Sequence, residues 1–252
     1  PTRRSSDLLL ARIDALGGLN APQDGLQGRI RVRSYDVPAY QCAADQWLAA
    51  AGAQVLFHAW ICGVAMADDD TLDALIVETK SGRRAVRARQ FVDATGDADV
   101  SHLAGVPTEW GDGTGNALYP STMCRIGGVD APRALEAVGE FKAIERLMDA
   151  AAGRYAFPRR GAILRPQKDP TVWRANVTQL RNAEGRAVDA TDAAQLSAAE
   201  AEGRRQIVDY LRFLRAEVPG FEAAEIAEIA AQVGVRETRR IHGAYRLTGD
   251  DV

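Results

Sequence analysis

The chain has 252 residues, of which 46% are hydrophobic and 26% are charged, a composition typical of a globular protein. Its net charge of −3 and its pI of about 5.7 argue against nucleic acid or acidic lipid as a partner. The longest apolar run, residues 59–67, is far shorter than the roughly 20 residues that a membrane span needs, so no membrane span is predicted.

The three cysteines, Cys42, Cys62 and Cys124, stand far apart and form no C-x-x-C pair. This spacing supports neither a zinc site nor a redox disulfide, and no metal site is predicted. We expect buried free thiols in a reducing compartment, which favours a cytoplasmic location.

The first eight residues, PTRRSSDL, are what a common sequencing-adapter string encodes when it is translated. We therefore interpret them as an assembly scar on a truncated reading frame, as in a metagenomic fragment, and we predict scar and loop for residues 1–33. The stretch RLTGDDV, residues 246–252, stops without a helix cap or polar tail, so both ends are expected to be cut. Genomic coverage that runs smoothly upstream through Pro1 would contradict the scar hypothesis.

The first clear element is a helix that follows SYDVPAY. Asp36 is a suitable N-cap, Pro38 fits the first turn, and Gly52 fits the position just after the last turn. Apolar or small residues recur at helical spacing, at Tyr40, Ala44, Trp47, Leu48 and Ala51. Next comes QVLFHAW, whose apolar run predicts a strand over Val55–Trp60 that is buried on both faces, with His58 as a core residue.

A small antiparallel meander is predicted next. Its strands are Cys62–Met66, Ala74–Thr79 and Ala85–Phe91, with Lys80-Ser81-Gly82 as the second turn. The first turn contains Asp68-Asp69-Asp70, which has neither the spacing nor the closing glutamate of a calcium loop.

The chain then runs through Phe91-Val92 into DATGD, residues 93–97, and Asp97 or Asp99 is predicted to cap a short helix that ends at Gly105. Small side chains let a ligand approach the backbone, and a helix N-terminus attracts phosphate. Ligands of open α/β sheets bind at the carboxyl ends of strands. The alternative is a tight strand-to-helix turn with an aspartate cap.

In the second half of the chain, the sequence predicts two strands and two helices. STMCRIGGVD, residues 121–130, and RANVTQL, residues 174–180, favour strands, and a helix is expected between Pro132 and Ala152. Ser197 to Glu200 matches a capping box that opens a long helix. Its inner stripe and its stop signal are Ile207, Leu211, Leu214 and Pro219-Gly220.

Three stretches in order, FVDATGDADVSHLAGVPTEWG, PSTMCRIGGVD and VGVRETRRIHGAYRLTGDDV, resemble the FAD-dependent oxidoreductase family of two-domain flavoproteins. The resemblance implies a mixed α/β fold: a partial FAD/NAD(P)-binding Rossmann-like domain with a β-meander over residues 34–120, and a truncated substrate or cap domain with a mixed sheet and helices over residues 121–252. It places the glycine-rich fingerprint upstream of residue 1 and the ribityl-binding segment beyond Val252. This chain is therefore expected to hold FAD poorly and to be inactive by itself.

The resemblance also implies cofactor-binding residues. Ala94, Thr95 and Gly96 belong to the turn that lies against the pyrophosphate side of FAD, and Asp97 is hydrogen-bonded nearby. The backbone of Val64 matches the position that meets the adenine.

A second candidate site is RETRR, residues 236–240. In a strand, Arg236, Thr238 and Arg240 share one face, and Arg236 and Arg240 are predicted to grip an anionic group or to place positive charge near the flavin. The alternative is an internal salt-bridge set with Glu237 plus a solvated face.

His242 is the third candidate, because an imidazole can accept a proton as hydride leaves for flavin. The alternative is a partly buried structural histidine. The predicted function is hydride transfer between a small organic substrate and FAD, with an unknown electron acceptor. The alternative is a non-catalytic ligand-binding or interaction module on a degenerate flavoprotein fold.

Overall fold

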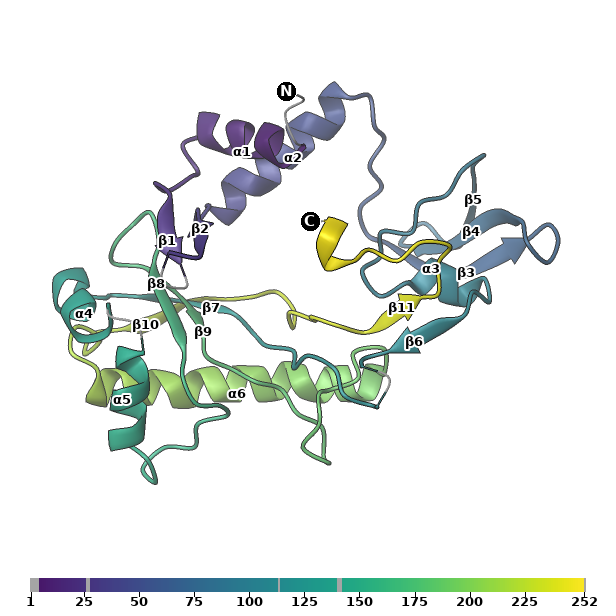
Figure 1. Ribbon diagram of the computed structural model, residues 1–252. Helices are drawn as coiled ribbons and strands as arrows, with labels where there is room; N and C mark the ends of the chain where they lie inside the picture. Colours follow the sequence, from purple (N-terminus) through teal and green to yellow (C-terminus); the bar gives the residue numbers. More distant parts are fainter. Residues whose placement is uncertain (1–4, 26–27, 113, 140–141, 252) are drawn as a thin grey trace. The chain divides into compact units, whose positions relative to one another are not determined.

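The computed structural model describes residues 5–25, 28–112, 114–139 and 142–251 (Figure 1). The chain divides into two units, each assembled from three separate segments. The helical unit consists of the described parts of Pro1–Gln54, Ser121–Leu180 and Ser197–Gly234. The meander unit consists of the described parts of Val55–Pro120, Arg181–Leu196 and Val235–Val252.

The helical unit is built on an antiparallel sheet with the strand order β10-β7-β9-β8. Its strands are β7 (Cys124–Gly127), β8 (Ile163–Pro166), β9 (Trp173–Asn176) and β10 (Glu225–Ile229). Side chains alternate along β9, so that Trp173 and Ala175 are buried in the core while Arg174 lies on the opposite face. One face of the sheet therefore packs in the core, and the opposite face is available for other contacts.

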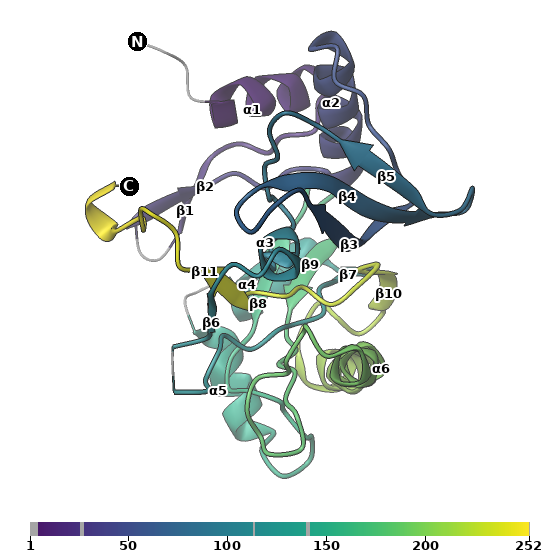
Figure 2. The same ribbon diagram turned by 90° about the vertical axis from the view of Figure 1, so that its right-hand side faces the viewer.

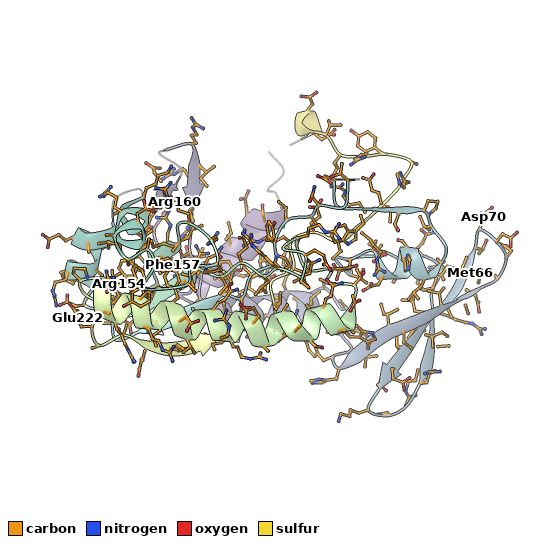
Figure 3. The ribbon with its side chains drawn as sticks, turned by 90° about the horizontal axis from the view of Figure 1, so that it is seen from below. Met66, Asp70, Arg154, Phe157, Arg160 and Glu222 are labelled. Atoms are coloured by element: carbon orange, nitrogen blue, oxygen red, sulfur yellow. The ribbon has the colours of Figure 1, made fainter. Side chains whose placement is uncertain are left out.

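The long helix α6 (Ala193–Glu217) packs on the buried face and contributes Ile207, Tyr210, Leu211, Phe213 and Leu214 to the core. Phe157 lies beside it, with ring centroids 4.9 Å from Phe213 and 5.8 Å from Tyr210 (Figure 3). Arg154 forms an ion pair with Glu217 at 2.7 Å near the end of this helix. Edge-to-face aromatic pairs of this kind stabilise a core beyond their buried area.

The helical unit also contains four further helices and a hairpin. These are α1 (Ser5–Ala15), β1 (Gln23–Gly25), β2 (Ile30–Val32), α2 (Val37–Ala50), α4 (Ala131–Val138) and α5 (Ala143–Ala150). Asp36 accepts a hydrogen bond from the backbone of Ala39 at 3.1 Å, which confirms it as the N-cap of α2. None of the described helices has the length and apolar character that crossing a bilayer requires.

The meander unit contains an antiparallel sheet with the strand order β3-β4-β5 (Figure 2). Its strands are β3 (Ala59–Met66), β4 (Leu72–Thr79) and β5 (Arg84–Arg87). The unit also contains α3 (Asp99–Leu103), the strand pair β6 (Thr108–Trp110) and β11 (Arg239–Ile241), and the 3₁₀ helix Gly249–Asp251. The predicted meander and the mixed α/β class are confirmed.

The predicted strand Val55–Trp60 is wrong over its first four residues. Strand β3 begins only at Ala59, and Leu56 and Phe57 are 62% and 65% exposed. A strand buried on both faces needs a packed layer over each face of its sheet, but none of the residues 55–66 is buried. His58, predicted as a core residue, is exposed and has a left-handed backbone with φ +56°, which interrupts the extended conformation.

The predicted strand at Phe91-Val92 does not form either. Val92 is 90% exposed, and residues 88–98 pair with no described strand. The stripe predicted for α2 is also wrong in detail, because its buried residue is Ala43, whereas Tyr40 and Leu48 are exposed. In both cases an apolar sequence pattern predicted buried side chains, but the side chains of Val92, Tyr40 and Leu48 are exposed in the structure.

The helix boundaries in the helical unit also differ from the predicted ones. Helix α6 begins at Ala193, because Asp192 accepts hydrogen bonds from the backbones of Ala194 and Gln195 at 2.8 and 3.0 Å. The predicted Ser197 capping box is therefore wrong, and the Glu200 carboxylate accepts from the backbone of Val233 instead. The single helix expected over Pro132–Ala152 is two helices, since Lys142 has a left-handed backbone with φ +63°.

The stretch 1–33, predicted as scar and loop, contains α1 and the β1-β2 hairpin among its described residues. Ile13 of α1 is 1% exposed, so this helix is packed rather than loose. Residues 1–4 of the proposed scar lie outside the described residues. The thiols also differ from expectation, since Cys42 and Cys62 are exposed and only Cys124 is buried.

Candidate functional site

The turn that contains Ala-Thr-Gly is organised by the carboxylate of Asp93. One oxygen of Asp93 accepts from the backbone N–H and the hydroxyl of Thr95, at 3.2 and 2.7 Å. The other oxygen accepts from the backbone N–H and the hydroxyl of Ser101, at 2.9 and 2.7 Å. Burial raises the pKa of Asp93, but these hydrogen bonds outweigh it, so that the net pKa is lowered. Asp93 is therefore held as a charged group at the centre of the turn.

The beginning of α3 is stabilised differently from the prediction. The N-cap position belongs to Ala98, whose φ is +54° and whose side chain cannot cap. The hydroxyl of Thr95 accepts from the backbone N–H of Asp99 at 2.9 Å, and Asp93 accepts from Ser101. The predicted capping by Asp97 or Asp99 is wrong, because the left-handed residue turns the chain so that Asp93 and Thr95 face the free N–H groups.

The same turn presents small residues at the surface. Ala94 and Gly96 are exposed, and a Cβ built on Gly96 would meet no atom within 4 Å. Gly96 has φ +89°, a conformation that glycine adopts without strain. Within the described part of the chain, the backbone N–H groups of Gly96 and Ala98 have no hydrogen-bond acceptor. The turn therefore offers open space and free donors.

Two residues of the RETRR segment join this turn. The hydroxyl of Thr238 donates to the Asp97 carboxylate at 2.5 Å, and Thr238 is 3% exposed. The guanidinium of Arg239 donates to the backbone carbonyl of Asp97 at 3.0 Å and forms an ion pair with Asp99. Asp97 is hydrogen-bonded within the chain, and its place beside a cofactor stays a prediction. The sequence analysis did not find Thr238 and Arg239 as partners of the turn.

Arg240, a predicted catalytic residue, is surrounded by acceptors. It forms ion pairs with Glu109 at 3.2 Å and with Glu237 at 2.9 Å, and it donates to the backbone carbonyl of Gly111. Glu237 also accepts from the backbone of Leu118 at 2.9 Å. The strand alternation predicted for residues 236–240 is wrong, because β11 begins only at Arg239, and Glu237 and Arg240 can therefore meet. This geometry favours the internal salt-bridge interpretation of Arg240.

The remaining predicted residues lie elsewhere in the meander unit. Arg236 and His242 are exposed, and the backbone N–H of His242 donates to Pro107 at 2.9 Å. Val64 is half-buried in β3, opposite Leu75 of β4. The structure joins Thr95 and Asp97 in one hydrogen-bonded turn, and within its described residues it does not connect Val64 or the imidazole of His242 to that turn by a hydrogen bond.

Two comparisons with known proteins found a similarity, one to a protein family and one to a solved structure. Residues 2–252 match the family described as FAD dependent oxidoreductase. A solved structure from a study titled "Structural and Functional Studies of BexE: Insights into Oxidation During BE-7585A Biosynthesis" is similar, with a TM-score of 0.53 and 17% identity. The match covers 94% of this chain but only 43% of that protein, and at this identity it shows the fold alone. No curated protein matched the chain.

Proposed function

Since the chain belongs to the FAD dependent oxidoreductase family, we propose that the turn Ala94–Asp97 lies against the pyrophosphate of FAD in an enzyme that transfers hydride between a small organic substrate and the flavin. The observation that carries the proposal is the exposed Gly96, with open space around it and free N–H groups beside it. Free backbone donors at a small-residue turn suit phosphate oxygens.

Three carboxylates close to the turn could repel a pyrophosphate, so their partners matter. Asp93 accepts four hydrogen bonds, Asp97 accepts from Thr238, and Asp99 pairs with Arg239. Each carboxylate is therefore already neutralised or hydrogen-bonded by donors of the protein itself. The residues present fit the group that the family binds.

The other roles rest on residue chemistry. Bound FAD would supply the hydride-accepting ring, and the protein would supply binding and orientation. We assign the backbone of Val64 to the adenine, Arg236 and Arg240 to an anionic group, and His242 to proton transfer. Among the three candidate catalytic residues, Arg240 has the weakest support, because Glu109 and Glu237 already pair with it.

We also keep the coarser expectations as part of the proposal. Residues 34–120 contribute to FAD binding and residues 121–252 to substrate binding, and an electron acceptor reoxidises the flavin. The exposed thiols of Cys42 and Cys62 are compatible with a reducing, cytoplasmic environment.

Titration of the chain with FAD, followed by flavin fluorescence, tests the proposal. We expect binding that is weak but saturable and that G96A weakens by a further factor of about ten, because a methyl group would occupy the space that the pyrophosphate uses. G82A is the matched control, since Gly82 also has a positive φ, of +96°, and a Cβ placed on it would likewise meet no atom within 4 Å. It lies in the β4-β5 turn and should leave FAD binding unchanged.

Equal FAD affinity in G96A and G82A, or no saturable binding by the unaltered chain, would contradict the proposal. Binding of FAD without reduction by any organic donor, in a protein that contains the whole family fold, would favour a non-catalytic ligand-binding module instead.

A further inference from the structure

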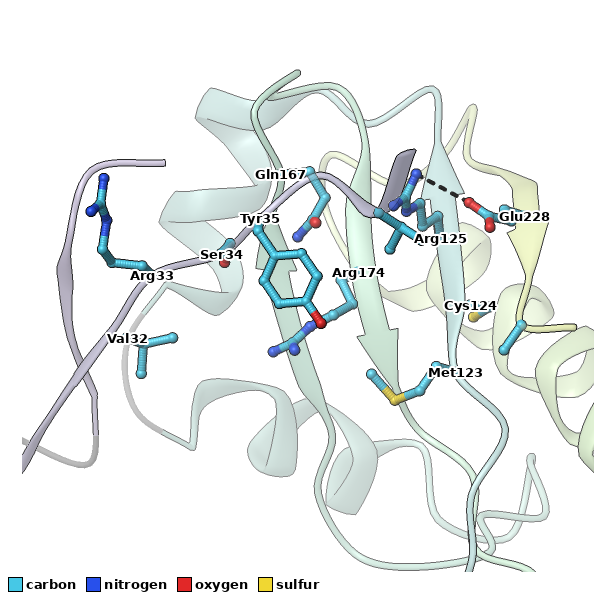
Figure 4. Close-up of a pocket in the computed structure, with 12 residues that line it drawn as sticks. Val32, Arg33, Ser34, Tyr35, Met123, Cys124, Arg125, Gln167, Arg174 and Glu228 are labelled. Carbon is cyan, nitrogen blue, oxygen red and sulfur yellow. Dashed lines mark ion pairs between the residues drawn. The ribbon is translucent and has the colours of Figure 1, made fainter. Parts of the chain in front are cut away.

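A pocket lies on the exposed face of the four-stranded sheet of the helical unit, opposite the core. Its volume is about 310 Å³, at the lower end of the range for small-molecule sites. Residues 32–37, between the hairpin and α2, form one wall, and the sheet forms the floor (Figure 4). All lining residues belong to the helical unit.

The sheet that forms the floor of this pocket carries a row of charged side chains, which extends beyond the pocket lining. Arg125 of β7 is in direct register with Arg174 of β9, and Arg174 is in direct register with Arg165 of β8. Like charges directly opposite each other destabilise a sheet. Glu228 of β10 is opposite Arg125, so the row contains three guanidinium groups and a single carboxylate. The sheet therefore has an excess of positive charge at this place.

The ion pairs near the pocket do not include Arg174, which therefore lacks a counter-charge among the described residues. Arg125 pairs with Glu228 at 3.1 Å, and Arg33 on the pocket wall lies 3.8 Å from Asp14. The side chain of Arg174 has no hydrogen bond or ion pair among the described residues, and its Nε is buried without a partner. Burial and the nearby Arg165 lower the pKa of Arg174. A half-buried guanidinium that lacks a counter-charge is costly unless a ligand supplies one.

The rest of the pocket indicates what the ligand carries besides its charge. Figure 4 shows the Tyr35 hydroxyl directed toward the guanidinium of Arg174. The amide of Gln167 also lines the pocket and offers a second neutral polar group. The apolar part of the lining consists of Val32, Val37, Met123 and Ala230.

We propose that this pocket binds a small organic carboxylate, whose anionic group is held by Arg174 and Tyr35 and whose apolar body packs against Val32, Val37 and Met123. A planar guanidinium matches a carboxylate with two parallel hydrogen bonds, and the phenol hydroxyl donates a third. The inference does not rest on the proposed function, and its test contains no FAD.

Isothermal titration calorimetry of the full 252-residue chain tests this site, with benzoate and hexanoate as probes. We expect saturable binding of at least one probe, with R174Q weakening it by at least about tenfold. Benzyl alcohol, a neutral analogue of similar shape, should bind at least about tenfold more weakly than benzoate. R165Q is the matched control: it removes one positive charge from the same row but not from the pocket lining, and it should change affinity by less than about threefold.

A thermal melt of each variant separates binding from folding. R174Q should melt at the same or a higher temperature than the unaltered chain, because it removes a half-buried charge that has no counter-charge in the free protein. The proposal is overturned if neither probe shows saturable binding up to about 10 mM, if benzyl alcohol binds as well as benzoate, or if R174Q keeps full affinity. A lower melting temperature of R174Q together with unchanged benzoate affinity would show that Arg174 is structural.

Discussion

At the scale of single residues, Asp93 shows how one carboxylate can organise a turn. Its two oxygens accept from Thr95 and Ser101, which stand on either side of the exposed Gly96. Backbone donors that would otherwise be unsatisfied at the start of α3 are satisfied by side chains from the preceding loop. Hydrogen bonds of the Asp93 and Thr95 side chains therefore fix the shape of the turn, and the exposed small residues Ala94 and Gly96 are not needed for this.

Replacing Asp93 with Asn tests this role. Asn retains one acceptor oxygen but puts an NH₂ group where Ser101 needs an acceptor, so D93N should lower the free energy of unfolding by about 1–2 kcal/mol at neutral pH. Urea denaturation measures it. D68N is the control, because Asp68 accepts from Asp70 in an exposed turn and should change stability by less than about 0.5 kcal/mol.

The pH dependence of the same variant has a defined sign. The pKa of Asp93 is lowered in the folded chain, so its charged form stabilises the fold above the unfolded pKa of about 3.9. That stabilisation is lost as the pH falls through the folded pKa. The difference between the unaltered chain and D93N should therefore shrink on acidification, and a difference that grows toward low pH would contradict the role assigned to Asp93.

The sequence indicated a small-residue turn at this place, but not the residues that cap α3 or the distant partners of the turn. Ala94, Thr95 and Gly96 were identified because small residues between a predicted strand and helix form a local pattern. Thr238 and Arg239 lie more than 140 residues away, and period-2 alternation grouped Thr238 with Arg236 and Arg240. Contacts between residues this far apart in the sequence depend on how the whole chain folds. A local sequence pattern carries no information about them.

At the scale of elements, the contact of α6 with the segment before β7 is unusually close. A Cβ on Gly203 would lie 2.0 Å from the Oγ1 of Thr122, which is fully buried. Thr122 is itself fixed by hydrogen bonds between its backbone and the hydroxyl of Thr178, at 2.8 and 3.0 Å. The helix therefore requires glycine at this position for packing, although glycine is a poor helix former.

Two substitutions in α6 separate packing from helix propensity. G203A should lower the free energy of unfolding by about 1–3 kcal/mol, because overpacking against Thr122 exceeds the gain in propensity. A201G, at an exposed position two residues earlier, should lower it by about 1 kcal/mol through propensity alone. Denaturant titration compares them, and a stabilised G203A would show that the helix can shift away from Thr122.

Among the elements, the inner stripe of the longest helix was predicted correctly, whereas several short strands were missed. Ile207, Leu211 and Leu214 are buried on α6 as their spacing indicated. Its beginning was missed because Asp192 and Ser197 both precede helical sequence, and only the observed hydrogen bonds distinguish them. Strands β6, β8, β10 and β11 have three to five residues each and form through distant pairing, which gives no local period.

At the scale of the whole molecule, the two units differ in how they bury apolar side chains. Every one of the largest fully buried side chains, such as Trp173 and Phe213, belongs to the helical unit. The meander unit instead exposes Phe57, Trp60 and Val92. The sequence placed Val55–Trp60 and Phe91-Val92 inside a sheet because apolar runs are typical of buried strands, but residues 55–58 and 91–92 pair with no described strand.

Thiol labelling reports the folded state of the chain. Burial raises the pKa of Cys124 to about 12, whereas Cys42 and Cys62 are exposed. With Ellman's reagent near neutral pH, the thiols of Cys42 and Cys62 should react quickly and that of Cys124 only after unfolding in guanidinium chloride. Rapid reaction of Cys124 in buffer would show that the core of the helical unit opens readily.

The interleaving of the units limits how the molecule can be divided by genetic engineering. Because each unit takes three separate stretches of chain, removal of residues from one terminus cannot yield the meander unit by itself. A stop codon after Gly234 would keep every stretch of the helical unit, yet it would delete Thr238 and Arg239 and so release Asp97 from its donors. Isolating the meander unit calls for internal deletions with new connecting loops rather than for truncation.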